Sequence, residues 1–203
     1  MTDYVVFDLE TTGFSPYTNE IIEIGAYKVK DGLVIDKFCT FVRPVQYIPL
    51  AIQDMTHITM DMVSDCEPIE TVIGEFYDFC ERLPLLGHNL NFDYSFTVAK
   101  CKAIGVDFTL GGARCGIDTC NLARKYLKLR DNKLQTVADS LHVSLEAKES
   151  YHRASYDAYV TKLIYDRFLL QYSKTPGITI PEMIDKPNTQ YGKAEISDVL
   201  PLE

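Results

Sequence analysis

Three mainly apolar runs, separated by short polar breaks, occupy the N-terminal part of the chain. Residues 4–9 are apolar except at Asp8, a pattern typical of a strand buried on both faces. Residues 21–29 and 33–42 are predicted as two further strands. Because Asp31-Gly32 between two such runs is a strong hairpin signal, the chain is predicted to begin with a three-stranded meander.

After Pro44 the apolar residues recur at helical spacing instead. Strands that alternate with helices after an initial meander predict an α/β fold with a mixed sheet. Residues 11–16 are predicted as a loop. The remaining predicted elements are helices over 69–82, 91–105, 119–129, 134–141 and 154–170, and short strands over 85–87 and 114–117.

The chain has the size of one ordinary domain, with 203 residues and a mass of 23.1 kDa. From about Ser173 the helical period stops, and prolines recur at positions 176, 181, 187 and 201. We therefore predict a domain over residues 1–173 and an extended C-terminal tail or linker over 174–203. A docking segment for a partner is the alternative interpretation of the tail.

Composition indicates a globular protein, because apolar residues make up 46% of the chain and charged residues 24%. No run approaches the roughly 18 to 20 apolar residues of a membrane span, and the first residues do not resemble a signal peptide. A cytoplasmic location with no membrane contact is therefore expected. The six cysteines form no C-x-x-C pair, so we expect free thiols rather than a zinc site or disulfides.

The net charge of −9 argues against a phosphate-backbone partner, which usually selects a basic surface. The charge is unevenly distributed, however. Residues 53–94 carry one basic and nine acidic side chains, whereas residues 95–133 carry eight basic and three acidic ones. The basic cluster could be a solvated helix face or could hold the phosphates of a substrate strand. Its members are Arg124, Lys125, Lys128, Arg130 and Lys133.

Four acids are candidates for a shared site. Asp8 interrupts the predicted apolar strand and Glu10 follows two residues later, so both side chains point to the same face if the strand continues. The alternative is a strand end that leads into solvent, with Glu10 already in the loop. Asp157 belongs to the apolar stripe of the last predicted helix. Asp93 lies near a helix start, where it could simply interact with the helix dipole. Buried carboxylates that lie together repel each other unless a cation compensates them.

One histidine can share a site with these acids only if it does not belong to the same regular helix as Asp157. His152 lies five residues before Asp157, which is about 140° off its face of an ideal helix. The two can share a site if His152 lies on a loop and Asp157 in the first helical turn. Oxygen ligands of this kind suit Mg²⁺ or Mn²⁺, and two such ions about 4 Å apart form the usual site for attack on a phosphodiester.

The same residues carry a resemblance to a known enzyme family. Three motifs in the right order and spacing, over about residues 4–170, resemble the DEDDh class of 3′–5′ exonucleases. This DnaQ-like group contains the proofreading epsilon subunit of bacterial DNA polymerase III, RNase T and oligoribonuclease. The motifs are Asp8-Leu9-Glu10-Thr11-Thr12-Gly13 with Glu20-Ile21-Ile22-Glu23-Ile24-Gly25, His88-Asn89-x-x-Phe92-Asp93, and His152-Arg153-Ala154-x-x-Asp157-Ala158.

The resemblance implies an RNase H-like fold, with a mixed five-stranded sheet flanked by helices, and release of 5′-mononucleotides from a 3′ end by a two-metal-ion mechanism. It implies that Asp8, Glu10 and Asp157 bind one ion, that Asp8 also binds the second, and that Asp93 supports the second. His152 would be the general base, since its ordinary pKa of about 6.5 suits that task at neutral pH.

The resemblance also implies a pocket for the terminal nucleotide. Phe92 could equally belong to the core, His57 could be an ordinary loop histidine, and His88 and Asn89 are expected mainly to hold the end of a strand. The residues expected at the pocket are Leu9, Thr11, Thr12, Met55, His57, Asn89 and Phe92.

The expected substrate is a single-stranded or frayed 3′ end of DNA, in proofreading or repair, with a DNA polymerase or another replication protein as a candidate partner. The alternative is an RNA exonuclease of the RNase T or oligoribonuclease type, because sugar discrimination depends on the pocket and not on the catalytic positions. A second alternative, a binding module that has lost catalysis, would lack a catalytic residue, and none of the five is missing.

Overall fold

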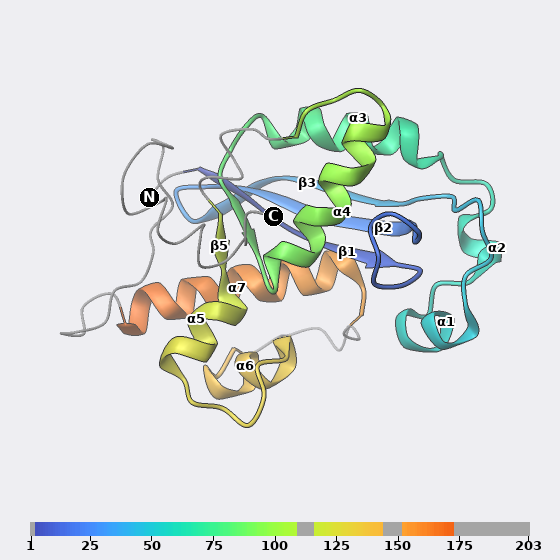
Figure 1. The fold of residues 1–203 in the computed structure, drawn as a ribbon. Coiled ribbons are helices and arrows are strands. Elements are labelled where there is room, and N and C mark those ends of the chain that lie inside the picture. The colour runs from blue at the N-terminus through green and yellow to red at the C-terminus, as the bar shows by residue number, and fades with distance from the viewer. Residues whose placement is uncertain (1–2, 109–115, 144–151, 173–203) are drawn as a thin grey trace.

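The computed structural model describes residues 3–108, 116–143 and 152–172 (Figure 1). The strands are β1 (Tyr4–Thr11), β2 (Ile21–Lys30), β3 (Leu33–Phe41), β4 (Leu85–Gly87) and β5 (Ile117–Asp118). The helices are α1 (Leu50–Thr56), α2 (Met60–Val63), α3 (Ile69–Cys80), α4 (Leu90–Ala103), α5 (Thr119–Tyr126), α6 (Leu134–Ser140) and α7 (Ala154–Tyr172).

The strands form one mixed sheet in the order β3-β2-β1-β4-β5. β1 pairs antiparallel with β2, and β2 antiparallel with β3, whereas β4 runs parallel to both β1 and β5. The predicted mixed five-stranded sheet, with an antiparallel meander followed by parallel strands, is therefore confirmed.

Helices cover both faces of the sheet (Figure 1). Val5 and Phe7 of β1 pack in one core with side chains of α3 and α4, while Val6 packs on the opposite face with side chains of α5, α6 and α7. Because side chains alternate along a strand, this arrangement buries β1 on both faces. A smaller core under α1 and α2 contains Ile22 and Ile48. It fixes α1 against the sheet near the carboxyl end of β1.

A glycine allows the last helix to begin directly over the sheet. A Cβ atom on Gly25 would lie 2.2 Å from the backbone carbon of Ala154 and from the backbone nitrogen of Ser155. Gly25 is the register partner of Asp8 in the neighbouring strand. The first turn of α7 can therefore approach the part of β1 that carries the acids only because position 25 has no side chain.

The structure differs from the predicted elements in three places. β1 continues through Thr11, which pairs with Ile21 after a bulge and so is not a loop residue. The short helices α1 and α2 were not predicted, since seven and four residues give too few turns for a periodic pattern. β5 follows the predicted strand 114–117 by one to three residues, and residues 114 and 115 lie outside the described ranges.

The tail predicted over residues 174–203 also lies outside the described ranges. Within them, no helix combines the length and the apolar character needed to cross a bilayer.

Candidate active site

Four acids from three elements lie at the carboxyl end of β1. Asp8 and Glu10 belong to β1, Asp93 to the first turn of α4 and Asp157 to the first turn of α7. Asp93 is 3% exposed, and its Oδ1 accepts a hydrogen bond of 3.1 Å from the backbone N–H of Leu9. This bond fixes the start of α4 against β1. The acids predicted from the sequence therefore lie together.

In the cluster, burial and mutual repulsion of the acids outweigh the positive charge nearby, that of Arg153. Burial raises the pKa of Asp8 well above its ordinary value, and repulsion from Asp93, Asp157 and Glu10 raises it further. Burial, and then repulsion from Asp157, raises the pKa of Glu10 to about 8. Burial also raises the pKa of Asp157 to about 7 and that of Asp93 well above its ordinary range. The site therefore requires protons or cations.

The residues present fit a divalent cation. Asp157 Oδ1 is buried and has no hydrogen-bond partner among the described residues. Ligand atoms of Glu10, Asp157 and His152 all lie within 4.8 Å of one another. A set dominated by carboxylate oxygens suits Mg²⁺ or Mn²⁺. A buried carboxylate oxygen without a hydrogen-bond partner, in a set of this kind, is suited to bind a divalent cation.

His152 lies on the loop immediately before α7, as its participation requires. Its backbone adopts a left-handed conformation (φ 70°), and its N–H donates to Asp157 Oδ2 at 3.1 Å. Desolvation of the ring is the main cause of a lowered pKa of His152, and the positive charge of Lys133 lowers it further. A lowered pKa favours the neutral imidazole, which can accept a proton.

An ion pair that the sequence analysis did not assign holds this loop in place. Glu23 of β2 is buried, and its carboxylate accepts hydrogen bonds from Arg153 Nη2 at 3.0 Å and from Arg153 Nε at 3.2 Å. It also accepts the backbone N–H of Ala154 at 3.0 Å, and the Arg153 guanidinium lies over the ring of Phe41. Glu23 thus has its own cation and positions two residues that lie between His152 and Asp157 in the sequence.

The β1–β2 loop is held by its own hydrogen bonds. The hydroxyl of Thr11 donates to the carbonyl of Gly13 at 2.7 Å, and the hydroxyl of Thr12 accepts the backbone N–H of Glu20 at 2.9 Å. The carboxylate of Glu20 in turn accepts the N–H groups of Val45 and Gln46. The hydroxyl groups of Thr11 and Thr12 therefore have internal partners, and their contact with a substrate stays a prediction.

The other predicted pocket residues surround the acids at different depths. Met55 is 41% exposed on α1, and His57, which ends that helix, is also exposed. Asn89 has a left-handed conformation, and its N–H donates to Asp118 Oδ1 at 2.8 Å, so it shapes the turn from β4 into α4. The N–H of Leu9 already donates to Asp93.

Phe92 is half-buried, and an aromatic neighbour that the sequence analysis missed is far more exposed. The Phe92 ring packs against Phe96 at 5.1 Å between centroids and against Phe14 at 6.5 Å. Phe14 is 86% exposed in the β1–β2 loop. In the sequence, the signal for Phe14 was a large apolar residue inside a polar loop. The exposed aromatic ring of this loop is therefore that of Phe14, with Phe92 packed behind it.

Comparison with known proteins gives a consistent family result. The family model RNase T, described as "Exonuclease", matches residues 5–165. The DNA polymerase III PolC-type of Thermotoga petrophila is 38% identical over 177 residues, and that of Clostridium perfringens is 43% identical over 160 residues. These alignments cover 87% and 78% of this chain but only 12% and 11% of the relatives' own lengths.

Solved structures share the fold. Exonuclease X in complex with 5′-overhanging duplex DNA superposes with a TM-score of 0.66 at 23% identity, covering 98% of this chain and 99% of that chain. The zinc-bound E. coli exonuclease I–ssDNA complex superposes with a TM-score of 0.73 at 16% identity, covering 85% and 41%.

Proposed function

The chain belongs to the exonuclease family that the RNase T model describes, and we propose that it is a metal-dependent 3′–5′ exonuclease that acts on DNA. The observation that carries this proposal is the convergence of Asp8, Glu10, Asp93 and Asp157 with His152 at one end of the sheet. These five residues come from three motifs that are far apart in the sequence.

In this proposal the acids hold two divalent cations, Mg²⁺ or Mn²⁺. Asp8, Glu10 and Asp157 would hold one ion, and Asp8 with the help of Asp93 would hold the other. When bound, such ions lower the pKa of a water molecule and stabilise the charge that develops on the phosphate and the leaving oxygen. The raised pKa values and the unpaired Asp157 Oδ1 support this assignment.

His152 would take a proton from the attacking water. It lies on the rim, within reach of the space between Glu10 and Asp157, and its lowered pKa keeps the imidazole neutral at pH 7. The water oxygen forms a bond to phosphorus while the bond from phosphorus to the 3′ oxygen breaks. The products are a 5′-mononucleotide and a strand shortened by one residue, with a 3′-hydroxyl.

The terminal nucleotide would lie between the β1–β2 loop and the end of α1. Phe14, backed by Phe92, offers a ring for the base on one side, and Met55 and His57 are exposed on the other. Leu9, Thr11, Thr12 and Asn89 would shape the floor and the turns of this pocket rather than supply free side-chain donors.

DNA is the proposed substrate because the relatives that match this chain are DNA polymerases. A role in proofreading, next to a polymerase active site, fits a chain that corresponds to about one eighth of those relatives. RNA is the competing substrate, and only the pocket around the terminal sugar separates the two.

The test is the digestion of a 5′-labelled single-stranded oligonucleotide, as DNA and as RNA, by the wild type, Asp8→Ala and the matched control Asp61→Ala. Asp61 is an exposed acid on α2. We expect a ladder that shortens by single nucleotides with Mg²⁺, no ladder with chelator or with Asp8→Ala, and a normal ladder with Asp61→Ala. Internal cutting, or release of the labelled 5′ nucleotide before any other, would contradict the proposed 3′–5′ polarity. A strong preference for RNA would contradict DNA as the proposed substrate.

A further inference from the structure

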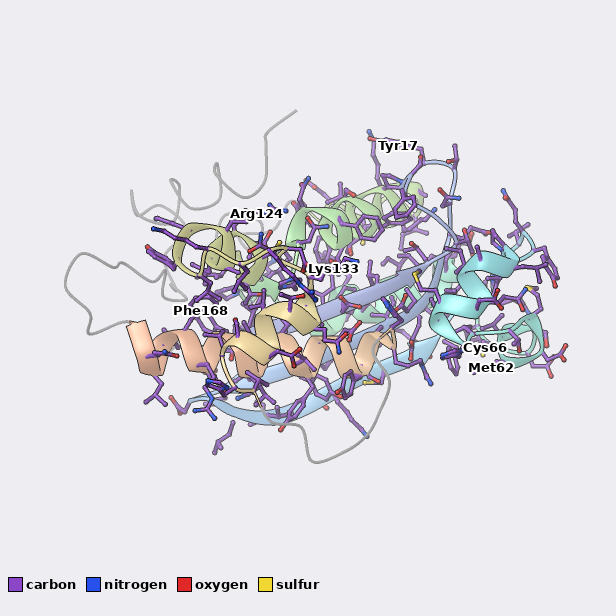
Figure 2. The ribbon with its side chains drawn as sticks, turned by 90° about the horizontal axis from the view of Figure 1, so that it is seen from below. Tyr17, Met62, Cys66, Arg124, Lys133 and Phe168 are labelled. Atoms are coloured by element: carbon purple, nitrogen blue, oxygen red, sulfur yellow. The ribbon has the colours of Figure 1, made fainter. Side chains whose placement is uncertain are left out.

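The five basic residues between positions 124 and 133 are not equivalent in the structure. Arg124 donates to Asn121 at 2.8 Å, the ammonium group of Lys125 lies over the ring of Tyr126, and Arg130 pairs with Asp131. The ammonium group of Lys133 has no hydrogen-bond or ion-pair partner among the described residues, and its side chain is exposed. Figure 2 shows Arg124 on α5 and Lys133 at the start of α6.

Lys133 is also the member of the cluster that the fold brings to the end of the sheet that carries the acids. β4 runs parallel to β1 with Leu86 opposite Val6, so His88 lies at the same end of the sheet as Asp8. The ring of His88 contacts the carbonyl of Asn132, the residue directly before Lys133. An exposed lysine at this end of the sheet suits a phosphate of a strand whose end enters the acidic cluster.

Hydrogen bonds hold the backbone around Lys133. The imidazole of His88 bridges the hydroxyl of Thr119 and the carbonyl of Asn132, with both distances at 2.8 Å. The N–H of Lys133 donates to Asp131 Oδ1 at 3.1 Å. The end of β4 thereby fixes the residue that precedes Lys133, so only the side chain of Lys133 has to be ordered when it binds a ligand.

We propose that Lys133 binds a backbone phosphate of the substrate strand adjacent to the terminal nucleotide, an inference that rests on the proposed function. The contact is a single ion pair and not a basic groove, because Arg124, Lys125 and Arg130 have partners in the protein, and within the cluster only Lys133 directly follows the residue that His88 holds. It would set the register of the strand relative to the acids, since a phosphate contact positions a strand without reading its sequence.

The test combines a variant with a modified strand. Single methylphosphonate linkages, which are neutral, are placed at successive positions of a labelled single-stranded DNA. The wild type, Lys133→Gln, Lys133→Arg and the control Lys30→Gln are compared for KM and kcat. Lys30 is an exposed lysine at the end of β2 remote from the site. We expect Lys133→Gln to raise KM about two- to five-fold, the effect of an exposed ion pair, with kcat unchanged and with Lys133→Arg restoring KM.

The wild type should show a raised KM at one particular linkage, and Lys133→Gln should remove the effect of that linkage and of no other. The proposal would be overturned if Lys133→Gln lowered kcat instead of raising KM, or if its KM equalled that of Lys30→Gln. It would also be overturned if the effects of Lys133→Gln and of the neutral linkage on KM were additive at every position. The proposal would likewise be overturned if a neutral linkage near the 3′ end changed the KM of the wild type at no position, whatever the variants do. A wild type with no exonuclease activity would instead contradict the proposed function.

Discussion

At the residue scale, the site is an anionic cluster whose charge the protein itself does not neutralise. Asp8, Glu10, Asp93 and Asp157 all have raised pKa values, whereas Glu23 nearby is paired with Arg153. The sequence indicated Asp8, Glu10 and Asp157 through acids on an apolar strand and an apolar helix stripe, which are unusual, and Asp93 only through the combination of the motifs. It could not predict the role of Glu23, whose partner lies 130 residues away and leaves no local pattern.

The raised pKa values predict a pH dependence of the metal-free protein. Glu10 and Asp157, with pKa values of about 8 and about 7, bind protons in the folded state that they release in the unfolded state, where their pKa values are about 4. Their contribution to stability is therefore fully present below about pH 4 and is lost progressively as the pH rises from there through these values. We expect the Tm of metal-free protein to fall from about pH 5 to about pH 8, as measured by thermal unfolding.

Mn²⁺ and the substitution Asp157→Asn are the controls for this pH dependence. Either should flatten the decline of Tm with pH, because Mn²⁺ compensates the charge of the carboxylates and asparagine removes the charge of Asp157. A decline of the same steepness with Mn²⁺ and without it would contradict the assignment of these acids as cation ligands.

The ion pair at Glu23 gives a second prediction at this scale. Glu23→Gln leaves Arg153 without its carboxylate and loosens the start of α7. We expect the free energy of unfolding to fall by about 2 kcal/mol in urea titrations and kcat to fall while KM changes little. In Glu20→Gln, a matched change at a residue that binds only backbone N–H groups of residues 45 and 46, kcat should be nearly normal. A change in KM with an unchanged kcat would contradict this positioning role of Glu23.

At the element scale, the site depends on how closely α7 approaches the sheet. The meander and the long helices could be predicted, because runs of eight or more residues carry a clear period. The helices α1 and α2 could not, although α1 places His57 on the rim. Contacts between elements, such as that of Gly25 with the first turn of α7, also leave no periodic signal.

Gly25→Ala should therefore damage the site from a position with no functional group. The added carbon would overlap the backbone of Ala154 and Ser155, so the first turn of α7 must move away. A displacement of about 1 Å should reduce kcat/KM by about 100-fold. Gly74→Ala, in α3, is the matched control. There the nearest atom to the new carbon lies 3.9 Å away, so we expect normal activity and an equal or higher Tm. Equal activity of the two variants would contradict this account of the approach.

At the scale of the whole molecule, the net charge of −9 does not exclude a nucleic acid, because the acids of the site are compensated by cations and the substrate is held only at its end. The acidic segment 53–94 includes α3, whereas the basic segment 95–133 includes α5, on the other side of the sheet (Figure 1). The sequence revealed this division, but only the structure distinguishes Lys133 from Arg124, Lys125 and Arg130, which have partners in the protein.

This charge distribution predicts weak binding with a shallow dependence on salt. In chelator, the affinity for single-stranded DNA should fall with log salt at a slope of about −1 to −2, since each phosphate contact contributes about −0.7. Fluorescence anisotropy over a salt series measures the slope. A slope several times steeper would indicate an extended basic groove and contradict a grip limited to the 3′ end.

The most direct test of the central claim is the rate at which 5′-mononucleotides leave the 3′ end of single-stranded DNA as Mg²⁺ is titrated into metal-free protein. The account predicts no release without the ion, saturation as Mg²⁺ rises, and at least about 100-fold slower release by Asp157→Asn, a variant that keeps the size of the side chain. Release that continues at an unchanged rate in chelator, or that Asp157→Asn leaves intact, would contradict it.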